Sequence, residues 1–93
     1  MRCVWKYELD LVDDWQLRPM PGGATVVNVD MQNGRLCLWA EVDPSLTLVD
    51  RWFVVEGTGH RFEHRGRHLG TAHAYGDKLV WHVYEVTPTV GGA

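Results

Sequence analysis

The sequence has few of the features that mark a secreted, membrane-bound or metal-binding protein. Its two cysteines, Cys3 and Cys37, form no C-x-x-C pattern, and the first ten residues, MRCVWKYELD, contain no apolar segment typical of a signal peptide. No apolar run approaches the length of a membrane span. We therefore expect a cytoplasmic protein with free thiols and no membrane partner.

Residues that could carry catalysis are also scarce. The chain has one serine, Ser45, which follows Pro44 and lies in no nucleophile motif. Asp13 and Asp14 are adjacent, which is typical of a solvated turn, and Cys37 could act only if a histidine approached it. We expect no catalytic residue, no cofactor and no enzymatic activity.

No window of the sequence favours a long helix, and the strongest local signal is a hairpin. Asn33-Gly34 lies between two alternating apolar segments and suits a type I′ turn, which needs two residues with positive φ. A two-residue loop puts an almost wholly apolar set on one face and a mixed set on the other. The expected apolar-face pairs are Met31–Leu36, Val29–Leu38, Val27–Ala40 and Thr25–Val42, and the mixed-face pairs are Gln32–Arg35, Asp30–Cys37, Asn28–Trp39 and Val26–Glu41.

A second hairpin is expected around Gly76-Asp77. Its register gives one face of small residues opposite large ones, as in a packed interior, and a second face with hydrogen-bonding groups. The first face has the pairs Ala74–Leu79, Ala72–Trp81 and Gly70–Val83, and the second has His73–Val80, Thr71–His82 and Leu69–Tyr84.

Three further segments have strand patterns: residues 3–11, 15–18 and 51–57. The segment 43–50 is expected to be a loop or a single helical turn. We predict an all-β fold, a small antiparallel sandwich or partly closed barrel of five to seven strands, in a single domain over residues 1–88, with a flexible tail over 89–93.

Four of the five histidines lie in GTGHRFEHRGRHLGTAHAYG, residues 57–76. A helix would align those at positions 60, 64 and 68, but the glycines of this stretch disfavour a helix. We therefore expect no metal site, with these three histidines solvated in a loop and His73 and His82 partly buried and hydrogen-bonded.

The turn GTGHR offers backbone N–H groups, a hydroxyl, an imidazole and a guanidinium to an anion. Its residues are Gly57, Thr58, Gly59, His60 and Arg61. The alternative is a glycine turn that only joins two strands, and no helix follows that would strengthen an anion site.

Aromatic residues are the feature that favours binding. Five tryptophans cannot all be enclosed in so small a core, and Trp39 falls on the polar face of its hairpin. The alternative is a tryptophan covered by its own chain. A net charge of −3 disfavours nucleic acid as the partner. The candidate binding surface is a mixed aromatic and histidine face made of Trp39, His73, His82 and Tyr84.

The segments WKYEL, QNGRLCLWAEVD, VVEGTGH, LGT and LVWHVYEV resemble an uncharacterised family of small proteins of tailed bacteriophages, including those of actinobacteria, and of prophages. The resemblance covers about residues 4–86. This chain has Glu8 where family members usually have proline, and its loop 64–68 is richer in arginine and histidine. The resemblance implies a bacterial cytoplasm during infection and an accessory role. The matching positions are Tyr7, Pro21, Gln32, Trp39, Gly57, Thr58, Gly59, His60, Gly70, Thr71, His82 and Glu85.

These observations predict a non-enzymatic, phage-type binding protein that engages a host protein through the mixed aromatic and histidine face or through the loop 57–68, in a takeover or anti-defence role. Exposed tryptophans and free sheet edges make a homo-oligomer the expected state. The alternative is a protein that sequesters an anionic, nucleotide-like small molecule through the turn 57–61, and a metal-dependent enzyme ranks third.

Overall fold

The structure, a computed structural model, describes residues 1–88, and these contain strands but no helix. No helix able to span a membrane therefore occurs among them. The expected flexible tail, 89–93, lies outside the described residues. The strands are β1 (Cys3–Leu9), β2 (Gln16–Leu17), β3 (Met20–Pro21), β4 (Thr25–Gln32), β5 (Arg35–Val42), β6 (Leu48–Val49), β7 (Trp52–Gly57), β8 (Arg67–Ala74) and β9 (Leu79–Val86).

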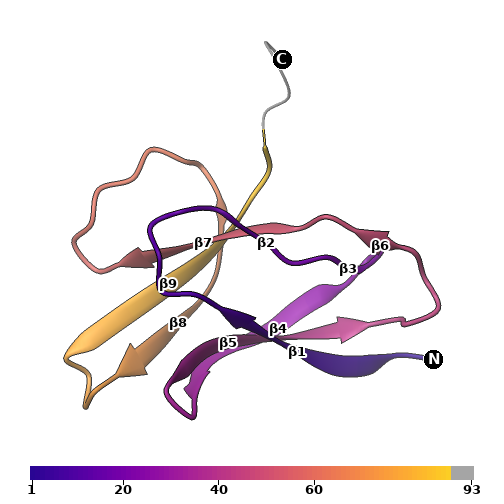
Figure 1. The fold of residues 1–93 in the computed structure, drawn as a ribbon, viewed down its shortest axis with the longest axis horizontal. Helices are drawn as coiled ribbons and strands as arrows, with labels where there is room; N and C mark the ends of the chain where they lie inside the picture. Colours follow the sequence, from indigo (N-terminus) through magenta and orange to yellow (C-terminus); the bar gives the residue numbers. More distant parts are fainter. Residues whose placement is uncertain (89–93) are drawn as a thin grey trace.

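The strands form an all-β fold of antiparallel sheets, as the sequence predicts (Figure 1). One sheet has the order β1-β5-β4, a second has the order β2-β7-β9-β8, and β3 pairs with β6 in a two-stranded ribbon. Six strands have six or more residues, within the predicted range, and the other three have two residues each. The two larger sheets face each other as a small sandwich, without a closed barrel.

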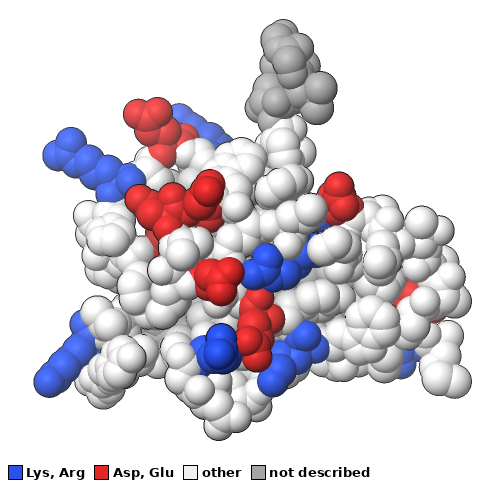
Figure 2. Space-filling view, viewed as in Figure 1, with Lys and Arg blue, Asp and Glu red and all other residues white. Residues whose placement is uncertain are grey.

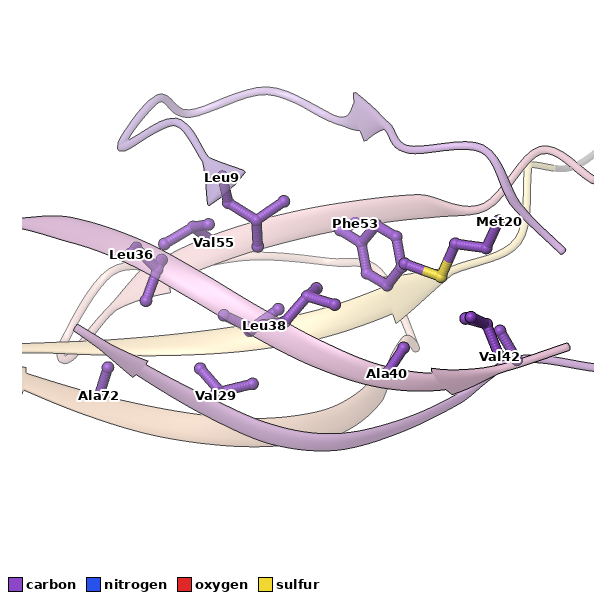
Figure 3. Packing of buried hydrophobic residues seen from close by; sticks show 12 residues of the cluster. Leu9, Met20, Val29, Leu36, Leu38, Ala40, Val42, Phe53, Val55 and Ala72 are labelled. Carbon is purple, nitrogen blue, oxygen red and sulfur yellow. The ribbon is translucent and has the colours of Figure 1, made fainter. Parts of the chain in front are cut away.

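The core lies between the two larger sheets (Figure 3). Alternate residues of β5 point inward, and Leu36, Leu38 and Ala40 are fully buried. They meet Phe53 and Val83 of the second sheet, which are also fully buried. Since successive side chains of a strand point to opposite faces, the residues between these positions lie on the two outer faces of the sandwich.

The first hairpin has the predicted register from Gln32–Arg35 to Asn28–Trp39. A β-bulge then shifts the pairing, so that Ala40 faces Val26 and not Val27. Val27 is 52% exposed, whereas Val26 packs against the core. The predicted pairs Val27–Ala40, Val26–Glu41 and Thr25–Val42 are therefore wrong by one residue.

The second hairpin has the predicted register from Ala74–Leu79 to Gly70–Val83. A second β-bulge lies between His68 and Gly70, and Tyr84 pairs with His68. Leu69, predicted to face Tyr84, packs against the core instead. The bulge thus turns an apolar side chain inward and a histidine outward.

The two larger sheets approach each other closely where β8 crosses β4. A Cβ atom at Gly70 would lie 2.8 Å from the Cβ of Val29, which real structures do not tolerate. Glycine is therefore required at this crossing, because only a residue without a side chain permits the contact. This contact fixes the position of β8, whose outer face carries part of the site described next.

Candidate histidine and aromatic site

A cluster of rings lies on the outer face of the four-stranded sheet and on the loop that connects β7 to β8. Val83 points into the core, so its neighbours His82 and Tyr84 point outward. The bulge in β8 presents His68 beside them, and the loop adds two more rings. We call this set the ring cluster; its members are Phe62, His64, His68, His82 and Tyr84.

The rings contact one another in a continuous series. Tyr84 is at the centre: its ring centroid lies 5.3 Å from that of Phe62, 5.1 Å from that of His64 and 5.1 Å from that of His68. Phe62 stacks on His64 at 4.4 Å, and His68 lies 5.8 Å from His82. These separations are typical of favourable aromatic packing, so the rings hold each other in place.

His64 anchors the loop to the sheet. Its Nε2 lies 2.9 Å from Oε2 of Glu56, and both side chains are at least nine-tenths buried. Its Nδ1 accepts a hydrogen bond of 3.1 Å from the backbone N–H of Gly66, so Nε2 is the nitrogen that donates to the carboxylate. The expectation that His64 is a solvated loop histidine is therefore wrong; a buried carboxylate holds it.

The other two histidines of the cluster are linked through threonine hydroxyls. His82 Nε2 lies 2.9 Å from Thr58 Oγ1, and His82 Nδ1 lies 3.0 Å from Thr71 Oγ1. Thr71 Oγ1 is also 3.2 Å from Nε2 of His68. The Thr58 hydroxyl donates to the carbonyl of Val80 at 3.5 Å, so it accepts from His82 Nε2–H.

This assignment fixes the direction of the remaining bonds. With Nε2 of His82 donating, Nδ1 accepts from the Thr71 hydroxyl, which in turn accepts from His68 Nε2–H. His68 Nδ1 then has no hydrogen-bond partner among residues 1–88. A hydroxyl beside an imidazole can serve as an activated nucleophile, but neither Thr71 nor His82 lines the groove described below.

The structure does not bring all the predicted site residues together. Thr58, His82 and Tyr84 come together, but Trp39 lies on the outer face of the three-stranded sheet, on the other side of the sandwich. His73 is exposed, and its Nδ1 lies 3.1 Å from the Asp77 carboxylate in the hairpin turn. The predicted face of Trp39, His73, His82 and Tyr84 is therefore wrong as a single surface.

Two N–H groups of the turn GTGHR are used in hydrogen bonds within the chain. The N–H of Thr58 donates to the carbonyl of Val80, and that of His60 donates to the carbonyl of Gly57. Gly59 has φ of 89°, the left-handed conformation that this tight turn needs. Arg61 is exposed beyond the turn. The structural alternative, a glycine turn that joins strands, accounts for these residues.

The described residues contain neither a cluster of metal ligands nor a cysteine next to the ring cluster. No group of three or more histidine, cysteine, aspartate or glutamate side chains is placed to hold a metal ion within residues 1–88. Cys37 is 1% exposed on the outer face of the three-stranded sheet, and burial raises the pKa of its thiol. It lies on the opposite side of the sandwich from the ring cluster, so the Cys–His pair considered from the sequence does not form there.

The outer face of the three-stranded sheet carries polar groups that pair with each other. Lys6 donates to the side chain of Gln32 at 2.9 Å, and Arg35 lies 3.5 Å from Glu8. Figure 2 shows acidic and basic side chains alternating over the region of β1 and β2, while few charged groups lie over β3 and β6. Lys6 and Arg35 on this face thus both have polar partners.

Part of the ring cluster could not be recognised from the sequence. The cross-strand pair Thr71–His82 follows from the hairpin register, which was predicted correctly there. Phe62 and Glu56 carry no local signal, because their roles depend on the loop folding back over the sheet. His68 was assigned to a loop, and only the bulge brings it to Tyr84.

Comparison with known proteins gives one match. A model of the family described as "Domain of unknown function (DUF7352)" matches residues 1–91. No curated protein and no solved structure matches the chain. The match covers nearly the whole sequence and carries no information on phage origin.

Proposed function

The chain belongs to the DUF7352 family, and from the geometry of its surface we propose that it is a non-enzymatic binding protein whose ring cluster engages a protein partner. The observation that carries this proposal is the position of the cluster. Five rings in mutual contact lie on the solvent side of a sheet instead of in the core. Aromatic side chains are enriched at the centres of protein interfaces.

The cluster is also fixed before any partner arrives. The Glu56–His64 hydrogen bond holds the loop, and the two threonine hydroxyls hold His82 from both ring nitrogens. Side chains that are already ordered lose less entropy on binding, so they contribute more to affinity. Phe62, 43% exposed, provides an accessible apolar contact, and His68 is exposed as well.

The proposed identity of the partner is based on the resemblance of the sequence to phage proteins. We propose a host protein, met in the bacterial cytoplasm, with an accessory role in takeover or anti-defence. We also propose that the chain self-associates. Leu46, Leu48 and Val49 are 49%, 58% and 43% exposed, and they lie on and next to β6 where few charged groups occur (Figure 2).

The test compares the two outer faces of the sandwich in one binding assay. The immobilised protein is exposed to a bacterial extract, and retained proteins are quantified by mass spectrometry for the wild type, for the double variant Phe62→Ala/His68→Ala, and for Trp39→Ala. The double variant removes two exposed rings, and Trp39→Ala removes a ring from the opposite face. We expect a partner that the wild type and Trp39→Ala retain equally and that the double variant retains about tenfold less.

Two results would contradict the proposal. One is a partner that Trp39→Ala loses and the double variant keeps, because binding would then use the opposite face. The other is the repeated absence of any specifically retained protein. Native mass spectrometry of the same samples gives the subunit number, and a monomer at micromolar concentration would contradict the proposed self-association.

A further inference from the structure

A second candidate site lies beside the ring cluster, where the loop after β7 meets the end of β9. A half-open groove of about 600 Å³ is lined by one exposed aromatic ring, basic side chains and the last residues of β9. This volume is in the range of sites for small molecules. The lining residues are Trp15, His64, Arg65, Gly66, Arg67, Glu85, Val86 and Thr87.

The arginines of the groove differ from those elsewhere in the chain. Four of the seven arginines form ion pairs: Arg2 with Glu41, Arg18 with Asp10, Arg35 with Glu8, and Arg51 with Glu85. The other three, at positions 61, 65 and 67, have no carboxylate partner among residues 1–88. An acidic protein thus gathers its unpaired guanidinium groups on one short segment, two of them in the groove.

The acidic group of the groove is already neutralised. Both carboxylate oxygens of Glu85 accept hydrogen bonds from Arg51, and the two side chains are about four-fifths buried. This hydrogen bonding raises the pKa of Arg51, so the pair stays charged and mutually compensated. The positive charges of Arg65 and Arg67 therefore dominate the groove.

The backbone that carries these arginines is held tightly. A Cβ atom at Gly66 would lie 2.8 Å from the carbonyl oxygen of Glu85 and 2.8 Å from a methyl group of Val86, so only glycine fits. The N–H of Gly66 also donates to His64. Arg65 and Arg67 flank this fixed residue and both line the groove, so the backbone from which their side chains extend is held in place.

From this arrangement we propose that the groove binds a small phosphorylated compound with a planar ring, the chemistry of a nucleoside phosphate. Arg65 and Arg67 donate charge-assisted hydrogen bonds to the phosphate oxygens, which match the fork of a guanidinium. Trp15, 39% exposed, provides a face for the planar ring. The groove shares His64 with the ring cluster, but the residues proposed to contact the phosphate and the planar ring, Arg65, Arg67 and Trp15, lie outside that cluster.

The experiment measures the binding of purine and pyrimidine nucleoside mono- and triphosphates by thermal shift and by tryptophan fluorescence. Inorganic phosphate and the unphosphorylated nucleosides are separate arms. The variants are Arg65→Gln, Arg67→Gln and Trp15→Ala, and the matched control is Arg35→Gln, an exposed arginine of the opposite face. Circular dichroism of each variant checks that the fold is retained.

We expect at least one nucleoside phosphate to raise Tm. Each groove arginine variant is expected to weaken its binding about tenfold, whereas Arg35→Gln leaves it unchanged. Trp15→Ala is expected to weaken nucleotide binding without affecting phosphate alone. Absence of binding by the whole panel, equal loss in Arg35→Gln, or phosphate binding as tightly as every nucleotide would each overturn the proposal. None of these outcomes decides whether the ring cluster binds a protein.

Discussion

The two outer faces of the sandwich differ in how they satisfy their polar groups. On the three-stranded sheet, Lys6 pairs with Gln32 and Arg35 with Glu8, so the face is complete in itself. On the four-stranded sheet, aromatic and imidazole rings remain at the surface, and the adjacent loop carries arginines without carboxylate partners among residues 1–88. Exposed rings and arginines without a carboxylate partner thus gather on the side of the four-stranded sheet.

The largest effect on stability is expected at His64, the residue that anchors the ring cluster to the sheet. His64→Ala leaves the carboxylate of Glu56 buried without its partner, and we expect a loss of about 3 kcal/mol of unfolding free energy. Urea unfolding followed by circular dichroism measures it. His68→Ala, an exposed histidine of the same cluster, is the control and is expected to lose much less. Equal losses in both variants would show that the cluster has no buried anchor.

A smaller effect is expected at the contact that positions β8. Gly70→Ala introduces a Cβ atom against Val29, and overpacking of this kind typically costs about 2 kcal/mol. Gly22→Ala is the matched control, because its Cβ would meet only the carbonyl of Thr47 at 3.7 Å. The control is expected to change stability by no more than about 0.5 kcal/mol. A tolerated Gly70→Ala would mean that the sheets are not in fixed contact here.

Substitutions on the self-satisfied face are expected to have still smaller effects. Glu8→Ala removes the carboxylate that lies 3.5 Å from Arg35, and both side chains are at least half exposed. Exposed pairs contribute at most about 1 kcal/mol, since water and salt screen them. A double-mutant cycle with Arg35→Ala isolates the pair. A coupling well above this value would show that the face contributes to stability more than the comparison assumes.

The smallest effect on stability is expected from chemical labelling of the cysteine thiols. Cys3 is exposed, whereas Cys37 is buried and has a raised pKa, so at any given pH a smaller fraction of it is thiolate. Iodoacetamide at pH 8 is expected to add one group to the native protein and two in denaturant, as intact mass shows. Labelling of Cys3 alone should leave Tm unchanged. Rapid labelling of both thiols in the native protein would indicate that the three-stranded sheet opens.

The two hairpins show how much of the strand pairing can be predicted from the local sequence. Asn33-Gly34 and Gly76-Asp77 specify their turns, and the alternation of side chains extends the register correctly for several pairs from each turn. Both predictions then fail at a bulge, beside Val27 in β4 and Leu69 in β8. The two strands cross where Gly70 meets Val29, and the bulges let each strand bend near this crossing while Val26 and Leu69 stay packed against the core.

The candidate site depends on these same features. The register correctly predicted that Thr71 faces His82, but the bulge decides that His68 and not Leu69 meets Tyr84. The grouping of Trp39 with the histidines failed for another reason. Alternation tells which residues of a hairpin share a face, and it does not tell which sheet that hairpin joins.

The sequence by itself determined the all-β class, the two hairpin turns and most of the residues that point inward, because turn geometry and side-chain alternation are local properties. Only the tertiary structure decided that His64 is held by Glu56, that Trp39 lies across the sandwich from Tyr84, and that Arg65 and Arg67 face a groove. Those contacts join residues of different strands and loops. Their geometry follows from how two sheets pack, which no short segment of the chain encodes.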